Sequence, residues 1–267
     1  MRMFWFFVLL IIYFPVQAES EDFWVLSNLE PPFSQIDERG KLNGYAVELV
    51  ENILHEAGIK QTILAAPWER VLKEGREKAN VLVFALARTP EREKDFHWIS
   101  PMTASVRGIY GLKPNAGKIN SLQDVGAYGA IGVLNGDFRH QLLSGINKSN
   151  VQVYSDWVNV IQALLTGQVK GVFFSDAGIE HYCKKNAWDC ADIQRVYTHQ
   201  KITTYLALSK PNTKQALVNT LSQAAQRYKR SDDYKRLSKT WLERYRQDDE
   251  VTMHEADGIV NLWHNPE

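Results

Sequence analysis

The residue pair with the clearest chemistry is Cys183 and Cys190, the two cysteines of the chain. They lie close together in a polar segment, and in an oxidising compartment such a pair closes as a disulfide. A metal site that uses His181 beside Cys183 is the weaker alternative, because no further cysteine or histidine stands at ligand spacing. We therefore expect a disulfide that holds a surface turn, with no catalytic role and no metal.

Catalytic motifs are missing from the rest of the sequence. It contains no Gly-x-Ser-x-Gly nucleophile elbow, no cluster of metal ligands and no phosphate-binding glycine loop. The 31 basic and 31 acidic side chains cancel, so no bulk positive field attracts nucleic acid or an anionic membrane. Several carboxylates could still move a proton on a substrate, which leaves an enzyme as the alternative. The sequence thus favours no catalytic site and no cofactor.

The N-terminus has the features of a leader. Arg2 supplies a positive charge, residues 3–15 are nearly all apolar, and small residues precede the expected cleavage point after Ala18. The apolar run is shorter than the ~20 residues that span a bilayer, so a retained anchor is the weaker alternative. No cysteine stands near Ala18, which argues against a lipid-modified N-terminus. Residues 1–18 are therefore predicted to be a signal peptide of an exported, soluble protein.

Short apolar runs alternate with helical patterns in the first half of the chain. The run at 81–87 is apolar throughout, which is typical of a parallel strand covered on both faces. Apolar residues recur with helical spacing over 46–57, and Gly58 ends that helix. The pattern predicts strands over 23–28, 61–65 and 81–87, and helices over 46–57 and 68–77.

The alternation of strands and helices continues in a second unit, where different residues mark the ends of the elements. Ser121 with Asp124 resembles a capping box, and Asp156 or Ser155 opens a helix that ends at Leu165. Strands are predicted over 107–113, 128–134, 151–154, 169–174, 193–197 and 202–208. Amphipathic helices follow Pro211 and Ser231, and the order of the polar tail from Gln247 is left open. The chain of 267 residues, 45% of them apolar, thus predicts an α/β fold of one or two domains.

Several short blocks, taken in order, resemble the periplasmic solute-binding proteins of polar amino acid ABC transporters, solute-binding protein family 3. They cover nearly the whole mature chain, and they are specific only in combination. The blocks are Pro31-Pro32-Phe33-Ser34, residues 40–49, Arg88-Thr89-Pro90-Glu91-Arg92, residues 96–101, Ile131-Gly132-Val133-Leu134-Asn135-Gly136 and residues 167–176.

The resemblance implies a type II periplasmic-binding-protein-like fold, in which two α/β lobes joined by two hinge strands hold a ligand between them. Residues 19–107 and 207–267 would form the first lobe, and residues 113–197 the second. The crossings would be 108–112 and 198–206. Which segments return to which lobe is an implication of the family, because periodicity along the sequence does not reveal it.

The resemblance also implies partners and a location. The protein would capture a small polar ligand, an amino acid or a related amine or carboxylate, in the periplasm. It would act as a monomer and pass the ligand to an inner-membrane ABC permease. A periplasmic sensor that docks to a receptor is the alternative, and an exported lyase on the same fold is a further one.

Two charged residues match the positions of the family that grip an amino acid. Arg92 would hold the α-carboxylate through two parallel charge-assisted hydrogen bonds, unless it is a surface residue paired with Glu91 or Asp95; Arg88 is a weaker substitute. Asp176, at the end of an apolar strand, would take the ammonium group, although an Asp there could also simply cap a helix.

Other positions depart from the amino acid pattern of the family. Ala85 and Ala87 stand where hydroxyl residues often reach the ligand, Asp137 replaces a hydroxyl residue, and Glu30 replaces an aromatic one. A carboxylate at a helix start partly fills an anion site internally. Glu30, Asp137 and Asp176 opposite Arg92 would make the cleft more acidic than basic, which favours a basic ligand such as a basic amino acid or an amine.

Aromatic side chains complete the candidate site. Trp68 follows Pro67 where the family places an apolar residue that lines the cleft, and its ring could cover a ligand or attract a cation. Tyr45 lies near the opening block and is a weaker candidate. Core packing is an equally good explanation for each of them, and Trp157 and Trp188 are interpreted as packing or surface residues.

Overall fold

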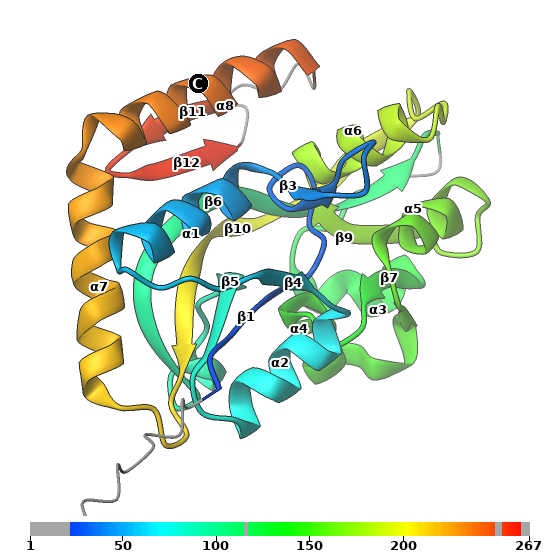
Figure 1. Ribbon diagram of the computed structural model, residues 1–267. Coiled ribbons are helices and arrows are strands. Elements are labelled where there is room, and N and C mark those ends of the chain that lie inside the picture. The colour runs from blue at the N-terminus through cyan, green and yellow to red at the C-terminus, as the bar shows by residue number, and fades with distance from the viewer. Residues whose placement is uncertain (1–21, 115–116, 249–252, 263–267) are drawn as a thin grey trace, which may run out of the picture.

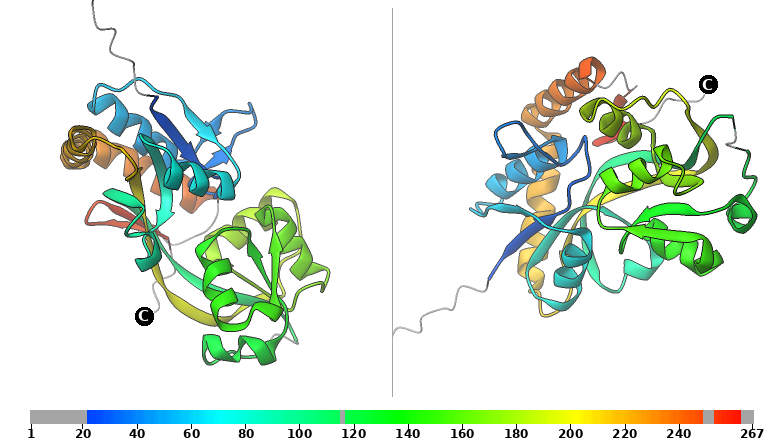
Figure 2. Two further views of the ribbon diagram at one scale, coloured as in Figure 1. Left: turned by 90° about the horizontal axis from the view of Figure 1, so that it is seen from below. Right: turned by 90° about the vertical axis from the view of Figure 1, so that its right-hand side faces the viewer.

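The computed structural model describes residues 22–114, 117–248 and 253–262, which form two α/β lobes joined by two long strands (Figure 1). In the left view of Figure 2, the first lobe holds the blue, cyan and orange segments, and the second lobe holds the green ones. The predicted two-lobed α/β fold with two joining strands is therefore confirmed. The predicted signal peptide, residues 1–18, lies outside the described residues.

The first lobe combines segments from both ends of the chain. Its elements are β1 (Trp24–Ser27), β2 (Gln35–Ile36), β3 (Leu42–Asn43), α1 (Tyr45–Glu56), β4 (Ile63–Ala65), α2 (Trp68–Glu77), β5 (Val81–Ala87), the 3-10 helix η1 (Pro90–Arg92), α7 (Gln215–Arg230) and α8 (Asp232–Asp248). β1 pairs in parallel with β4 on one side and with β5 on the other. β2 and β3 form a small separate hairpin.

Apolar patterning explains how these elements pack. All seven residues of β5 are buried, as expected of a parallel strand covered on both faces. The buried residues of α1 recur with helical spacing, and they share one core with residues of α7 and α8. That core contains Leu49, Ile53, Leu221, Tyr228 and Trp241. The two C-terminal helices therefore pack against the first lobe, as Figure 1 also shows.

The second lobe repeats the same architecture. Its elements are η2 (Leu122–Asp124), α3 (Val125–Tyr128), β7 (Ile131–Leu134), α4 (Phe138–Asn147), η3 (Lys148–Asn150), β8 (Val151–Tyr154), α5 (Trp157–Leu165), β9 (Gly171–Ser175) and α6 (Asp176–Lys185). β7 pairs in parallel with β8 and β9. Asp137, Asp156 and Ser175 cap α4, α5 and α6 by accepting backbone N–H groups. The predicted capping box of Ser121 and Asp124 is present at η2.

Two long strands, β6 (Phe96–Leu112) and β10 (Ile193–Ser209), join the lobes. They pair with each other antiparallel over their whole length, while β5 adds to β10 and β9 adds to β6. The register shifts at several points along the pair, and such irregularities let a strand bend and twist. One sheet thereby runs through both lobes in the order β4-β1-β5-β10-β6-β9-β7-β8. The exact hinge residues remain a prediction.

The joining strands are longer than the sequence pattern indicates. The predicted strand over 107–113 is the end of β6, and the two predicted runs over 193–197 and 202–208 are parts of β10. The polar residues from Thr198 to Lys201 interrupt the apolar pattern of β10, yet their backbone continues the pairing with β6. Strand length here is set by pairing with a distant segment, which a local pattern does not report.

A C-terminal hairpin adds to this junction. β11 (Met253–Ala256) pairs with β12 (Ile259–Leu262), and β12 pairs in parallel with β6 at residues 103–105. The Lys229 ammonium donates to the backbone carbonyls of Pro101 and Gly258, and burial lowers its pKa to about 8. The tail that the sequence left open is therefore ordered over 253–262.

The predicted disulfide is present between Cys183 and Cys190, whose Cα atoms lie 6.1 Å apart. It ties α6 to the turn that precedes β10. Within the described ranges, no helix combines the length and the apolar character that a membrane crossing requires. In the same ranges, the histidine, cysteine and acidic residues form no group of three or more suited to a metal ion.

The stability of the fold should fall in mild acid because of His181. Burial beside Lys185 lowers the pKa of His181 to about 4, against 6.5 in an unfolded chain. Between these pH values the unfolded state binds the extra proton, so the free energy of unfolding decreases as pH falls. Because His181 is only half-buried, we expect the loss between pH 7 and pH 5 to be about 1–2 kcal/mol.

Urea denaturation at the two pH values measures this loss. A His181→Gln variant carries no such proton and should lose correspondingly less stability between pH 7 and pH 5. If the wild type and the variant lose the same amount, His181 is not the group responsible.

Candidate functional site

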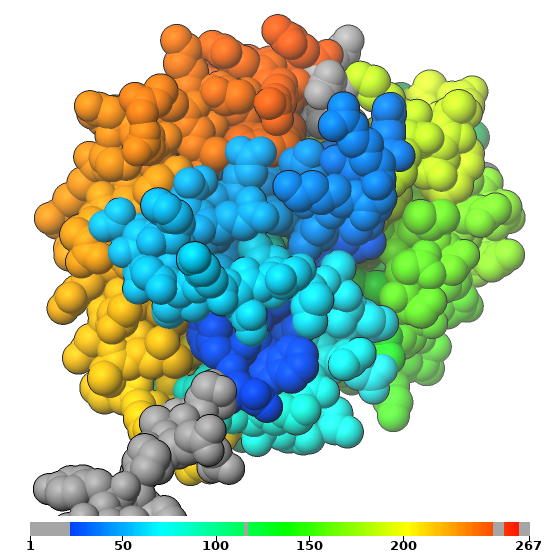
Figure 3. Space-filling view, in the orientation of Figure 1, coloured from blue at the N-terminus to red at the C-terminus, as the bar shows by residue number. Residues whose placement is uncertain are grey.

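The parallel strands of both lobes end around one cavity. Residues that close or follow β1, β4, β7 and β8 line it, and the carboxyl ends of strands are where open α/β sheets bind ligands. The cavity has a volume of about 420 Å³ and lies between the lobes. Its lining includes Asn28, Pro31, Trp68, Leu134, Trp157 and Tyr182. In Figure 3 the blue and cyan first lobe meets the green second lobe along this junction.

Arg92 lies at this junction with unused hydrogen-bonding capacity. Its side chain is fully buried, and its Nη1 donates to the backbone oxygen of Ala87 at 3.0 Å. Its Nε and Nη2 have no hydrogen-bond partner, and its guanidinium lies 5.7 Å from the ring centre of Trp68. Burial lowers the pKa of Arg92 to about 10, so the group stays protonated at neutral pH.

The surface alternative for Arg92 does not fit these contacts. Asp95, one of the two suggested partners, pairs with Arg76 at 3.0 Å, whereas the other, Glu91, is exposed and attracts a guanidinium that is itself buried. Arg88, the suggested substitute, is exposed and pairs with Glu93 at 2.7 Å. Arg92 is therefore the arginine of this segment that is directed toward the junction of the lobes, where it is attracted by Asp137 of the second lobe.

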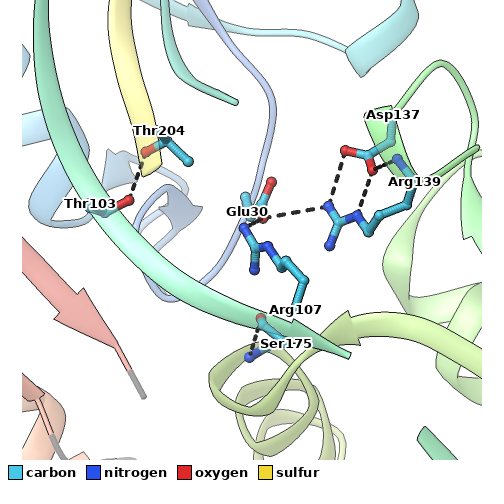
Figure 4. Close-up of polar contacts among 8 residues, drawn as sticks. Glu30, Thr103, Arg107, Asp137, Arg139, Ser175 and Thr204 are labelled. Carbon is cyan, nitrogen blue, oxygen red and sulfur yellow. Dashed lines mark hydrogen bonds and ion pairs between the residues drawn. The ribbon is translucent and has the colours of Figure 1, made fainter. Parts of the chain in front are cut away.

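Four further charged side chains form a buried cluster at the same junction (Figure 4). Glu30, in the loop after β1, accepts a hydrogen bond from Arg107 Nη2 at 2.9 Å, and its Oε1 lies 3.7 Å from Arg139 Nη2. Asp137 caps α4 and accepts from the backbone and the guanidinium of Arg139, whose Nη2 is 3.0 Å away. We call Glu30, Arg92, Arg107, Asp137 and Arg139 the charged cluster.

Arg139 is also enclosed by aromatic rings. Its guanidinium lies 4.4 Å from the ring centre of Trp157 and 5.4 Å from that of Phe174, and these two rings stack at 3.8 Å. Burial disfavours its charge, but Asp137 and Glu30 outweigh burial and raise its pKa. Burial likewise works against the ionised Asp137, yet Arg139 holds the pKa of that carboxyl below its usual value. Both members of the pair are therefore charged.

The hinge strand β6 contributes Arg107 to the cluster. Burial lowers the pKa of Arg107, and the neighbouring Glu30 opposes that effect. Arg107 Nε and Arg139 Nη1 have no hydrogen-bond partner, which adds two unused donors to those of Arg92. The cluster thus contains three guanidinium groups and two carboxylates.

Asp176 lies at the start of α6, beside the hinge strands. Its carboxylate accepts a hydrogen bond from the hydroxyl of Tyr110 and pairs with Arg195 Nη1 at 3.2 Å. Burial and Asp176 together raise the pKa of Tyr110 well above its usual value. Simple helix capping does not explain Asp176, because Ser175 caps α6 by accepting from Gly178 at 3.2 Å.

The two alanines close the end of β5. Both are buried, and Ala87 supplies the backbone oxygen that holds Arg92. Ala85 has a φ of +56°, a left-handed conformation that is uncommon for a residue with a Cβ. Neither side chain can hydrogen-bond, and neither belongs to the lining of the cavity.

The aromatic candidates have different surroundings. Trp68 lines the cavity, and its indole Nε1 has no hydrogen-bond partner. Tyr45 lies in the first-lobe core, where its hydroxyl contacts that of Tyr234 at 3.1 Å. Core packing accounts for the contacts of Tyr45. Trp157, interpreted from sequence as a packing or surface residue, lines the cavity with an unpartnered Nε1 as well.

The expectation of an acidic cleft is wrong, since Glu30, Asp137 and Asp176 are each paired with an arginine. The sequence analysis missed Arg107 and Arg139, which lie outside the blocks that resemble the family. The signal for Arg107 was a single arginine in a strand that contains no other Arg, Lys, Asp or Glu. For Arg139 it was an arginine in the first turn of a helix, where a positive charge opposes the helix dipole.

A ligand-binding protein is the class that this fold and junction define. The family model of the bacterial extracellular solute-binding proteins, family 3, matches residues 24–244. The chain therefore belongs to that family, and it is a solute-binding protein.

Individual relatives are distant in sequence. The chain is 20% identical over 229 residues to the arginine-binding periplasmic protein of Mannheimia haemolytica, covering 85% of this chain and 93% of that one. It is 24% identical over 221 residues to the L-cystine-binding protein of Escherichia coli, covering 81% and 80%. A solved ancestral arginine-binding protein bound to arginine has a TM-score of 0.68 at 23% identity, covering 82% and 97%.

The Asp137–Arg139 pair should carry much of the stability of this junction. Asn in place of Asp137 preserves the helix cap but removes the charge that Arg139 needs, so Asp137→Asn should lower the free energy of unfolding by about 3 kcal/mol. Asp156 is a matched control, because it caps α5 through Asn159 and is not in the charged cluster.

Urea denaturation of both variants tests this expectation. Asp156→Asn should change the free energy of unfolding by less than about 0.5 kcal/mol. Equal losses in the two variants would mean that capping, rather than the buried ion pair, determines the effect.

Proposed function

We propose that this protein captures a small carboxylate-bearing solute, an amino acid or a close relative of one, in the cavity between its lobes. It acts as a monomer in the periplasm and passes the solute unchanged to an ABC permease of the inner membrane. Relatives named for arginine, L-cystine and histidine support the amino acid class. The first-lobe residue that holds the carboxylate in this proposal is Arg92.

The state of Arg92 is the observation that carries the proposal. A fully buried guanidinium with two unpartnered nitrogens is costly in a folded protein unless a ligand completes its bonds. Nε and Nη2 lie on one edge of the guanidinium plane, and that edge matches the two oxygens of a carboxylate. A carboxylate bound there would also lie close to Trp68, which lines the cavity.

Binding in this proposal is coupled to closure of the lobes. Arg92 belongs to the first lobe, whereas Asp137 and Arg139 belong to the second, and Glu30 reaches across to Arg139. A ligand that contacts both lobes binds the closed form better than the open form, so it shifts the population toward closure. Asp176 shares its carboxylate with Tyr110 and Arg195 beside the joining strands, so those partners already use its oxygens.

Removal of the Arg92 side chain should abolish tight binding. The variant Arg92→Ala loses two charge-assisted hydrogen bonds, so the affinity for the tightest ligand should fall by about 100-fold or more. That ligand is found by titration calorimetry with the proteinogenic amino acids and small carboxylic acids. The matched control is Arg88→Ala, because Arg88 is exposed and paired with Glu93.

Two outcomes would contradict the proposed function. Affinity that is equal in Arg92→Ala and Arg88→Ala would show that the ligand does not use Arg92. Chemical turnover of the bound compound by the wild-type protein would instead indicate an enzyme.

A further inference from the structure

The charged cluster has an unbalanced charge. Its three guanidinium groups and two carboxylates are all buried and sum to one positive charge, and the further carboxylate that attracts Arg92, Glu91, is exposed to solvent. Asp176 pairs with Arg195, and the cavity lining adds one carboxylate, Asp156, and one ammonium group, Lys185, so these residues add no net charge. Burial of an uncompensated charge is expensive, so the cluster favours a ligand that supplies one net negative charge.

The hydrogen-bonding groups without a partner also favour an anionic ligand, because most of them are donors. Four guanidinium nitrogens have no partner: Arg92 Nε, Arg92 Nη2, Arg107 Nε and Arg139 Nη1. The indole nitrogens of Trp68 and Trp157, both at the cavity, add two more donors. The cavity lining offers one buried side-chain acceptor without a partner, Asn28 Oδ1. Because neither guanidinium nor indole nitrogen can accept, the ligand must be rich in acceptors.

The side chains that would bind a cationic ligand already contact an arginine of the protein. Stacked aromatic rings next to carboxylates would suit a guanidinium or ammonium group. In this chain Trp157 and Phe174, with Asp137 and Glu30, surround the guanidinium of Arg139 itself. A basic ligand would therefore have to approach Arg139, and the carboxylate that lines the cavity, Asp156, already accepts hydrogen bonds from Ser155 and Asn159.

We propose, resting on the proposed function above, that the cavity, together with the charged cluster that adjoins it behind Trp68 and Trp157, takes a small solute with a net charge of −1. Two classes carry that charge: an acidic amino acid, and a monocarboxylate without an ammonium group. One carboxylate pairs with Arg92. The remaining acceptor atoms of the ligand take the donors of Arg107, Arg139 and the two indoles. A zwitterionic amino acid of net charge zero leaves the cluster with its excess positive charge.

Matched ligand pairs that differ mainly in charge test this inference on the full-length wild-type protein. Calorimetric titration compares L-glutamate with L-glutamine, and L-lactate with L-alanine, and includes L-arginine as a cation. In at least one pair the anionic member should bind about 10-fold tighter or more, and L-arginine should bind more weakly than that anion. Mass spectrometry of compounds released on denaturation should likewise identify a solute of net charge −1.

A charge variant sharpens the comparison. Glu30→Gln removes one buried carboxylate, so it should widen the preference for the anionic member by about 10-fold. Glu69→Gln is the matched control, since Glu69 is an exposed carboxylate at the lobe junction that only accepts from Asn135. It should leave the preference within about twofold. If Glu30→Gln does not fold, the wild-type pairs decide the question.

The outcomes separate this inference from the proposed function. If a neutral or basic amino acid binds tightest and depends on Arg92, the proposed function holds and the inference about charge is overturned. If no compound of the panel binds and none is released on denaturation, both are overturned. Anionic ligands that bind equally well to Arg92→Ala would retain the charge preference and overturn the assigned carboxylate site.

Discussion

The burial of charge at the lobe junction is the constraint on which the rest of this structure depends. A charged group taken out of water must be paired, neutralised or bound to something that completes its bonds. Glu30 and Asp137 are paired with Arg107 and Arg139, but Arg92 keeps two unpartnered nitrogens. The buried cluster therefore carries, at the meeting point of the lobes, one positive charge more than its own carboxylates balance.

The architecture brings these groups together from distant parts of the chain. Glu30 follows β1, Arg92 follows β5, Asp137 follows β7, and Arg107 lies in the strand that joins the lobes. Parallel strands direct their carboxyl ends to one edge of a sheet, so each loop contributes a side chain to the same place. Because Glu30 and Arg139 belong to different lobes, any opening of the junction must separate them. This ion pair therefore links the two lobes.

The chain's own residues set the character of the lobe junction. Ala85 and Ala87 offer no side-chain hydrogen bond, whereas Arg107 and Arg139 each keep an unpartnered donor nitrogen. Arg139 itself lies between the aromatic ring of Trp157 and the carboxylate of Asp137. A shared fold at 20% identity therefore does not carry the ligand of one member to another.

The sequence by itself determined the local structure and the class of protein. The apolar run of β5, the helical spacing of α1 and the helix caps at Asp137, Asp156 and Ser175 follow from local physical chemistry, because each depends on neighbouring residues. Arg92 could be singled out for a similar reason, since it stands in a recognisable block of residues.

Only the tertiary structure decided the charge of the site. The sequence shows which acidic residues are present, but it does not show that Arg107 and Arg139 pair with Glu30 and Asp137. Glu30 and Arg139, for example, meet across 109 positions of the chain. The full length of β6 and β10 and the pairing of the C-terminal hairpin were equally non-local. An ion pair or a strand partner is set by distance in space, and spacing along the sequence does not encode that distance.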